Sequence, residues 1–305
     1  MARYIARRAF GALLALIAVT IVTFVLVHLL PGNVAWALLG RDATAARAAA
    51  LARKMGLDLP LPLQYLRWLG LLFQGGLQSG FSLAPPTLEL LALGGGVALV
   101  LGLGTALVQE RLRGSFWDHG IGLALYTLYT FPSFWLGMML IYLFSFVLFW
   151  FPGNGPYDGP GSAGLLHWAY YMVLPVAAIS LTTAATWTTH FRAAIGEALQ
   201  SDYVRTARAK GMTESRLMLR HVMRNAALPI VTVMGMSLPG MFNNVVAIEW
   251  VFHMQGLGAG LIGDLAGMNY GGVVDLVLVI GFVTVLGSLF ADLLYAFADP
   301  RIQFS

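Results

Sequence analysis

The chain has 305 residues, of which 58% are hydrophobic and only 10% are charged. Its mean hydropathy of +0.76 excludes an ordinary soluble globular protein and indicates an all-α polytopic membrane protein. The chain contains no cysteine, which excludes disulfides, thiolate chemistry and zinc-finger sites. The formal net charge of +4 could suggest nucleic-acid binding, but in a membrane protein it is more typical of cationic cytoplasmic loops.

Six apolar stretches are long enough to cross a bilayer, which takes about 20 helical residues. They lie at roughly 10–30, 88–108, 120–149, 170–191, 227–251 and 273–298. The first follows three arginines, as a secretory signal would. This first stretch is longer than the ~7–15 apolar residues of a signal sequence, and no A-x-A cleavage site follows it. We therefore predict that it is an uncleaved transmembrane span. The third span contains Pro132, which predicts a kink.

The segment between the first two predicted spans, from Pro31 to about Thr87, carries helical patterns of its own. "ATAARAAALARKMG" predicts an Ala-rich helix closed by Gly56, and "LPLQYLRWLGLLF" predicts a second, amphipathic helix. A connection of this size with internal helices is typical of a small packed cap. The alternative is that it merely joins the two spans.

Cation counting predicts the orientation in the membrane, because cytoplasmic loops carry an excess of Lys and Arg. An even number of spans places both termini on one side. With the N-terminus inside, thirteen of the 18 Lys and Arg residues are cytoplasmic: Arg3, Arg7, Arg8, Arg111, Arg113, Arg192, Arg205, Arg208, Lys210, Arg216, Arg220, Arg224 and Arg301. The other five, Arg41, Arg47, Arg53, Lys54 and Arg67, fall outside. We therefore predict cytoplasmic N- and C-termini.

The loop between spans four and five, "SDYVRTARAKGMTESRLMLRHVMRNAALP", holds six of these cations. Asp202 can cap a short helix that Gly211 closes, and Thr213 can cap a second helix. On the second helix we expect a cationic stripe and, beside it, an apolar stripe. The cationic stripe comprises Arg216, Arg220 and Arg224, and the apolar stripe comprises Leu219, Val222, Met223 and Ala226.

Two partners are compatible with this helix–glycine–helix unit, which we expect to lie against the membrane. A basic amphipathic loop can rest on anionic lipid headgroups, each cation contributing about 1 kcal/mol. However, "RTARAKG" is small and polar and has no evident apolar face to bury in lipid. Small side chains at helical spacing suit close docking into a groove on a protein, which we favour.

The segment "DYVRTARAKGMTESRLMLRHVMRNAALPIVT" resembles the cytoplasmic loop of ATP-binding cassette (ABC) importer permeases, in the branch of dipeptide, oligopeptide and nickel permeases. The resemblance covers almost the whole chain. It extends to "MARYIARR…LVHLLPGN", "MGLDLPLPLQYLRWL", "FPSFWLG", "EWVFHMQGLG" and "DLLYAFADPRI". Together these motifs are specific, although any one alone is weak.

The resemblance implies a type I ABC importer permease with six transmembrane helices. In such proteins this loop contains the coupling helix, which fits a cleft on a cytoplasmic ATPase subunit. Arg205, Thr206 and Ala207 stand where the family has Glu-Ala-Ala, so a glutamate contact to the ATPase is not carried over. The implied ATPase-docking residues are Tyr203, Arg205, Thr206, Ala207, Arg208, Lys210, Gly211, Met212 and Thr213.

The stretch "MFNNVVAIEWVF" brings polar residues toward the outer end of span five, where such residues usually face a cavity. The resemblance places this region beside the outer gate. The implied gate and path residues are Asn243, Asn244, Glu249, Gly256, Leu257 and Gly258. Glu249 can alternatively reach interfacial water. Met254-Gln255 replaces the family's common Trp-Pro, so the local backbone of the gate can differ.

Several other functions are disfavoured by the sequence. It has no G-x-x-x-x-G-K-[ST], H-E-x-x-H or G-x-S-x-G, and its histidines are scattered, so we expect a transport subunit without catalytic residues, metal or cofactor. An ion-coupled secondary transporter, the main alternative, normally needs a mid-membrane carboxylate. Glu89, Asp275 and Asp292 are expected to be interfacial caps instead.

The resemblance also implies partners, a location and a domain organisation. The partners are a second permease, related or identical, two ATPase subunits that bind ATP and Mg, and an extracytoplasmic binding protein that does most of the substrate selection. The substrate would be a peptide, a nickel complex or a similar solute. We expect a multi-pass protein of a bacterial or archaeal inner membrane, in contact with lipid and not with nucleic acid. Residues 1–86 would form the first span and cap, and 87–300 the permease core with coupling loop 192–227.

Overall fold

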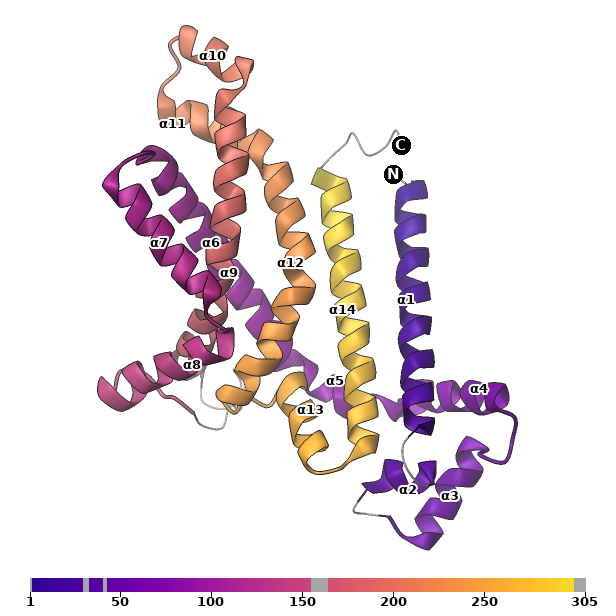
Figure 1. Cartoon of the computed structure of the whole chain (residues 1–305). Coiled ribbons are helices and arrows are strands. Elements are labelled where there is room, and N and C mark those ends of the chain that lie inside the picture. The colour runs from indigo at the N-terminus through magenta and orange to yellow at the C-terminus, as the bar shows by residue number, and fades with distance from the viewer. Residues whose placement is uncertain (1, 30–32, 41–42, 155–163, 299–305) are drawn as a thin grey trace.

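The computed structural model describes residues 2–29, 33–40, 43–154 and 164–298, which contain helices and no strands (Figure 1). Residues 30, 31, 41 and 299–302, which entered the predictions above, lie outside these ranges. The helices are α1 (Ala2–His28), α2 (Val34–Leu39), α3 (Ala45–Met55), α4 (Leu61–Leu71), α5 (Gln78–Ser82), α6 (Ala84–Arg111), α7 (Phe116–Thr130), α8 (Ser133–Ile141), α9 (Leu165–Gln200), α10 (Asp202–Ala209), α11 (Glu214–Leu217), α12 (Met223–Val251), α13 (Leu257–Ala266) and α14 (Tyr270–Ala298). Three π-helical turns, η2 (Leu72–Gly76), η3 (Tyr142–Val147) and η4 (Met218–Val222), extend α4, α8 and α11.

Five of the six predicted spans are confirmed as long apolar helices, namely α1, α6, α9, α12 and α14. The third predicted span is divided into α7 and the unit α8–η3, which meet at 103°. Phe131 precedes a proline, which disfavours helical dihedrals, and its φ of −77° and ψ of 131° are extended. Pro132 then stands at the N-cap of α8. The predicted kink is therefore a complete break.

The centre of the fold is the contact between α6 and α9. Every fourth residue of α6 is buried, in the series Leu90, Gly94, Ala98, Gly102 and Ala106. Small side chains at this spacing allow two membrane helices to approach closely. A Cβ at Gly102 would already touch Phe191 and Trp187 of α9 at 3.4 Å. Thr188 Oγ1 also donates to the carbonyl oxygen of Gly102 at 3.3 Å.

Helices α2 to α4 form the predicted cap at one end of the spans, opposite α10 (Figure 1). Gly56, at a φ of +67°, closes α3 as expected. The cap packs on the first and last long helices, because Met55 and Trp68 share an apolar cluster with Phe24 of α1 and Leu278 of α14. It is therefore a packed unit and not only a connection.

The three acidic residues expected to be interfacial caps each contact a second helix. Asp275 Oδ2 accepts from the backbone N–H of Gly80 at 2.9 Å, and its side chain is 6% exposed. Glu89 accepts from Trp168 Nε1 at 3.3 Å, and Asp292 pairs with Arg8 at 3.2 Å. Each carboxylate thus links two elements that are far apart in the sequence.

Candidate docking helix and translocation path

The short helix α10 stands at the tip of α9, from which a single residue, Ser201, separates it. Ser201 is the N-cap, with an extended backbone and no side-chain cap hydrogen bond. The predicted cap, Asp202, is instead the first helical residue, where its charge favours the helix N-terminus. Thr213 occupies the N-cap position of α11 as expected, also without a side-chain cap bond.

Gly211 closes α10 as predicted, in a left-handed conformation with a φ of +77°. Its N–H donates to the carbonyl of Arg208 at 2.9 Å, and the N–H of Met212 donates to the carbonyl of Ala207 at 3.2 Å. This pair of bonds is the Schellman motif, which satisfies carbonyl groups that the helix end would leave unpaired. A Cβ at Gly211 would meet nothing within 4 Å, so the positive φ alone disfavours other residues there.

One face of α10 packs on the chain's own core. Val204 is fully buried and Ala207 is 7% exposed, in a cluster with Ile195 of α9, Leu217 of α11 and Val222. Within "RTARAKG" only Ala207 is buried, and with Val204, which precedes this stretch, it contacts the protein core. Two small apolar side chains three residues apart form a narrow face that the periodicity did not reveal. The polar and charged residues of α10 remain exposed to solvent.

The second helix of the loop does not form the separate membrane-surface helix that we expected. It runs from Glu214 through η4 and α12 to Val251 as one continuous span helix. The π-turn also changes the register, because it inserts extra residues relative to the α-helical repeat. Val222 and Ala226 are buried as predicted, but Leu219 is 76% exposed. Arg216, Arg220 and Arg224 of the predicted cationic stripe are all exposed.

An ion pair connects α10 to α11. Arg208 Nε and Nη2 donate to the two carboxylate oxygens of Glu214 at 2.7 and 3.1 Å. The hydrogen bonds to this carboxylate, and its charge, raise the pKa of Arg208 above its usual value. A bidentate pair restrains both side chains. It therefore holds the end of α10 against the start of α11, on either side of the turn at Gly211.

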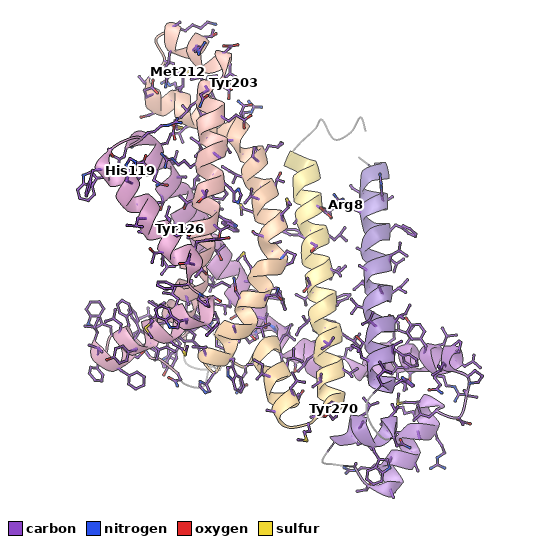
Figure 2. All side chains as sticks on the ribbon, in the orientation of Figure 1. Arg8, His119, Tyr126, Tyr203, Met212 and Tyr270 are labelled. Atoms are coloured by element: carbon purple, nitrogen blue, oxygen red, sulfur yellow. The ribbon has the colours of Figure 1, made fainter. Side chains whose placement is uncertain are left out.

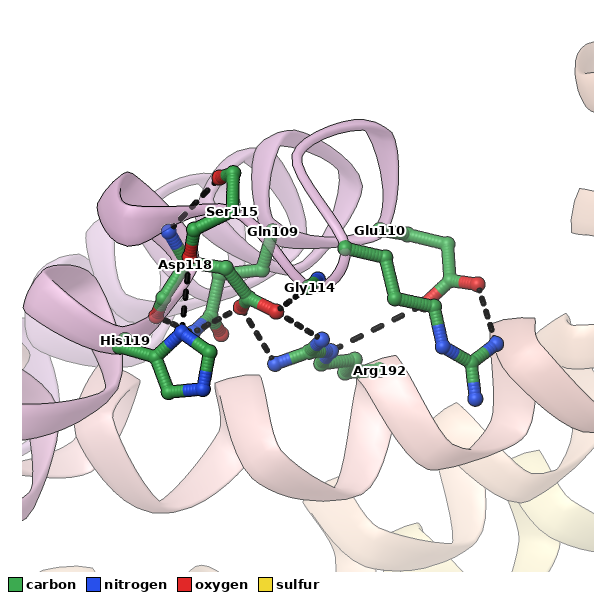
Figure 3. A network of polar contacts seen from close by, with 8 residues as sticks. Gln109, Glu110, Gly114, Ser115, Asp118, His119 and Arg192 are labelled. Carbon is green, nitrogen blue, oxygen red and sulfur yellow. Dashed lines mark hydrogen bonds and ion pairs between the residues drawn. The ribbon is translucent and has the colours of Figure 1, made fainter.

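A second polar network joins the start of α7 to α6 and α9, and sequence reasoning missed it (Figure 3). Arg192 of α9 bonds both carboxylate oxygens of Asp118 at 2.8 Å and lies 3.7 Å from Glu110. Glu110 also pairs with Arg113 at 3.0 Å, and Gln109 Nε2 donates to Asp118 Oδ1 at 3.3 Å. The network fixes α7 against the helix that carries α10.

The sequence contained one local signal for this network. In "GSFWD", Ser115 is followed three residues later by an acid, as in a capping box. Ser115 is the N-cap of α7, and its hydroxyl accepts from the N–H of Asp118 at 3.2 Å. Asp118 in turn accepts from the N–H of Gly114 at 3.0 Å. The local motif could have been recognised, but its partner Arg192 lies 74 residues away.

Two cavities lie along the α9 side of the molecule. The smaller, of about 340 Å³, lies among α8, α9 and α12. Its lining combines apolar and aromatic residues, such as Phe131, Trp187 and Met241, with hydroxyl and amide side chains: Ser133, Thr182, Thr183, Thr186, Ser237 and Asn244. The larger, of about 890 Å³, lies among α6, α7 and α9, beside the Arg192 network. Tyr129 and Thr186 line both. Together the cavities form a surface of mixed polar and apolar side chains along α9.

The structure separates the two asparagines of span five. Asn244 lines the smaller cavity and accepts from Ser133 Oγ at 3.1 Å. Asn243 is exposed and does not line that cavity. Since they are adjacent on a helix, they point in directions about 100° apart.

Glu249 is fully buried, so it does not reach interfacial water. Its carboxylate caps α13, accepting from the N–H groups of Gly258 at 2.7 Å and Ala259 at 3.2 Å. Thr87 Oγ1 of α6 donates to it at 2.5 Å and accepts from the N–H of Leu257 at 2.9 Å. Gly256 is the N-cap, and a Cβ there would overlap the Glu249 carboxylate. Of the predicted gate residues, Glu249, Gly256, Leu257 and Gly258 thus form one buried junction of α6, α12 and α13. Asn243 and Asn244 are not part of it.

No group of three or more His, Cys, Asp or Glu side chains within the described ranges could hold a metal ion. The ionisable groups of the Arg192 network are engaged in ion pairs with one another. The groups available along the cavities for contact with a solute are therefore hydroxyls and amides, with the Arg192 network, His190 and Glu197 at the larger cavity.

Two family models match the chain. Residues 98–304 match the model described as binding-protein-dependent transport system inner membrane component. Residues 1–86 match the corresponding N-terminal model. The chain belongs to this family. As its membrane component, the permease is a non-catalytic subunit of the inner membrane that works with an ATPase and a binding protein.

Known permeases are similar along their whole length. The glutathione transport system permease protein of Pectobacterium atrosepticum is 33% identical over 316 residues, covering 100% of both chains. The di/tripeptide transport system permease protein of Pseudomonas aeruginosa is 31% identical over 333 residues, covering 99% of each. The crystal structure of an amino acid ABC transporter with histidines matches with a TM-score of 0.52 at 16% identity, over 74% of this permease and 95% of that chain. This last similarity supports the fold.

Proposed function

We propose that this permease forms half of a path for the import of short peptides, glutathione-like tripeptides included. The relatives named for di/tripeptide and glutathione transport support this substrate class over nickel complexes. A second permease, related or identical, would supply the other half of the path. Two ATPase subunits would bind from the cytoplasm, and a binding protein would deliver the peptide. Residues 1–86 would carry the first span and outer cap, and 87–300 the core, with coupling loop 192–227.

The direct connection of α9 to α10, through the single residue Ser201, supports this proposal most strongly. α9 has 36 residues, and at 1.5 Å per residue it is about 54 Å long. That length exceeds the ~30 Å hydrocarbon core, so its end extends beyond the membrane. α10 is fixed there by buried Val204 and Ala207. A force applied to α10 would therefore move α9, which lines both cavities.

The exposed face of α10 is the proposed ATPase contact. Of the residues that the family resemblance implied, Tyr203, Arg205, Thr206, Arg208, Lys210, Gly211 and Thr213 are exposed. Ala209, which the resemblance did not include, is exposed as well. Ala207 is buried and Met212 is half-buried, both against the permease core. We therefore assign these two a role in holding the helix and leave the contact to the exposed side chains.

Reconstitution tests the function. The permease, its partner permease, the ATPases and the binding protein are placed together in liposomes, and ATP hydrolysis and uptake are measured. We expect di- and tripeptides to stimulate both, and we expect the permease alone to hydrolyse no ATP above background. Stimulation by a nickel complex but not by peptides would overturn the substrate class, and uptake driven by an ion gradient without ATP would overturn the mechanism.

The proposed orientation predicts labelling from opposite sides. The start of α1 and the end of α14 lie at the same end of the molecule as α10, opposite the cap (Figure 1). Ala50 in the cap and Ser215 beside α10 are both exposed, and the chain has no cysteine to interfere. In intact cells, Ala50→Cys should react with an impermeant maleimide and Ser215→Cys should react only after permeabilisation. Labelling of both from outside would contradict the orientation. The count of Lys and Arg residues from which this orientation was predicted includes Arg41 and Arg301, which lie outside the described residues.

The path assignment predicts different effects at adjacent positions. Asn244→Leu replaces an amide that lines the smaller cavity and leaves the Ser133 hydroxyl without its acceptor. We expect peptide uptake to fall about tenfold, as the loss of ~1.4 kcal/mol of stabilisation along the path would produce. Asn243→Leu, at an exposed position, should have a smaller effect. Uptake and ATPase co-purification are measured for both, and a larger loss with Asn243→Leu would contradict the assignment.

A further inference from the structure

A groove of about 660 Å³ lies between α1 and α14, away from the cavities of the proposed path. Its lining residues on α1 recur at helical spacing from Arg8 through Ala12 to Ala15. On α14 they run in the opposite direction, from Asp292 through Ser288 to Val285. The groove therefore follows the axes of two antiparallel helices from one end of the spans inward.

Among the described residues that line the groove, the charged side chains are two arginines and one aspartate at its mouth. Arg8 lies between α1 and α14 (Figure 2). It pairs with Asp292 of α14 at 3.2 Å. Arg7 lines the same mouth, is exposed, and has no ion pair or hydrogen-bond partner among the described residues. The two arginines and one carboxylate sum to a charge of +1, which matches one phosphodiester group.

The deeper part of the groove is narrow, open and largely apolar. Ala15 lies seven residues from Arg8, about 10 Å along the helix. A Cβ at Gly11 would meet nothing within 4 Å, so the space beside α1 is unfilled. Val285 and Leu289 form the opposite wall together with the hydroxyl residues Thr284 and Ser288. The length of this part of the groove and its mainly apolar lining suit the first carbons of an acyl chain and not a soluble anion.

The surface around the groove is apolar. Phe10 is 60% exposed, Leu13 is 53% exposed and Leu14 is 50% exposed, all within a helix apolar enough to cross a membrane. A cationic mouth between transmembrane helices, bordered by such a surface, is the arrangement that recognises lipid headgroups. We propose that this groove binds one anionic phospholipid, with its phosphate at Arg7 and Arg8 and an acyl chain along Gly11 and Ala15.

The proposal predicts selective retention of an anionic lipid. The delipidated, purified full-length permease is titrated with phosphatidylglycerol or with phosphatidylcholine of the same chains, and the first bound lipid is quantified by native mass spectrometry. We expect phosphatidylglycerol to bind more tightly. Arg7→Gln should weaken its binding about fivefold, because one cation at a lipid headgroup contributes about that factor. Arg111→Gln removes an exposed cation outside the groove and should change nothing.

A second pair of variants tests the acyl-chain part of the site. Gly11→Leu places an apolar side chain beside the groove, where a Cβ meets nothing within 4 Å, and should weaken the binding of both lipids while leaving the charge unchanged. Gly104→Leu, on α6, is the matched control, because a Cβ there also meets nothing within 4 Å. Equal affinity for the two lipids, or equal losses in Arg7→Gln and Arg111→Gln, would overturn the proposal. Displacement of the lipid by inorganic phosphate at millimolar concentration would do so too, because it would show a site for a free anion.

Discussion

Gly211→Val should abolish stable capture of the ATPase subunit while the permease still inserts into the membrane. Valine resists the left-handed conformation at a φ of +77°, at a cost of about 1–2 kcal/mol or more. No atom lies within 4 Å of an added Cβ, so steric contact adds nothing to this cost. The population with a correctly closed α10 should fall about tenfold. Co-purification with the tagged ATPase measures this loss.

A matched control separates docking from general strain. Gly114, between α6 and α7, has a φ of +78° and is equally open, so Gly114→Val imposes the same backbone cost outside α10. We expect Gly114→Val to retain the ATPase. Gly211→Asn should retain most of the binding, because asparagine tolerates the left-handed region. Equal losses for the two valine variants would show that α10 has no special role.

Two tryptophan substitutions test which face of α10 docks. Ala209 is exposed, so Ala209→Trp should leave the permease folded and block close approach of the ATPase. Ala207 is 7% exposed, so Ala207→Trp overpacks the permease core, which typically costs about 1–3 kcal/mol. We expect Ala207→Trp to lower thermal stability, and Ala209→Trp to leave it unchanged.

Arg216→Gln tests the alternative that the loop binds lipid, because Arg216 is exposed beside α10. If the loop docks on the ATPase, this variant should have a milder effect on ATPase capture than Ala209→Trp. If the partner were lipid, the loss of the cation should be the most damaging of these changes and Ala209→Trp should be silent. That ranking would refute the docking role.

Features with a local physical cause were predictable from the sequence. Apolar length alone identified α1, α6, α9, α12 and α14, because a bilayer sets the length of a spanning helix. Gly56 and Gly211 were recognised as helix ends because glycine adopts a positive φ at little cost. The cap helices α3 and α4 followed from the same kind of local signal.

Features that depend on partners far along the chain were not predictable. Thr87 and Glu249 are 162 residues apart, and no local pattern shows that they share a hydrogen bond. The register of Leu219 depends on the π-turn η4, which has no compositional signature. The angle of the break at Pro132 depends on the packing of α8 against α9 and α12, which lie farther along the chain. The proline gave the position of the break but not its angle.

The junction at Glu249 gives the largest expected loss of stability. Glu249→Ala leaves two buried donors, the Thr87 hydroxyl and the N–H of Gly258, and the part-buried N–H of Ala259 without their acceptor. An unsatisfied buried donor costs about 1–3 kcal/mol, so we expect a loss of roughly 4 kcal/mol or more in the free energy of unfolding. Thermal unfolding in detergent measures it. Glu197→Ala, at an exposed position of α9, is the control and should change little.

A double-mutant cycle then tests the geometry of the junction itself. A Cβ at Gly256 would overlap the Glu249 carboxylate, so Gly256→Ala should destabilise the otherwise unchanged permease. In the Glu249→Ala background the carboxylate is absent and the methyl group has room, so the same substitution should cost almost nothing. Residues in direct contact show such non-additivity, with coupling of about 0.5–3 kcal/mol. Additive losses would mean that the added methyl group does not meet the Glu249 carboxylate. The capping of α13 by Glu249 through this close approach would then be wrong.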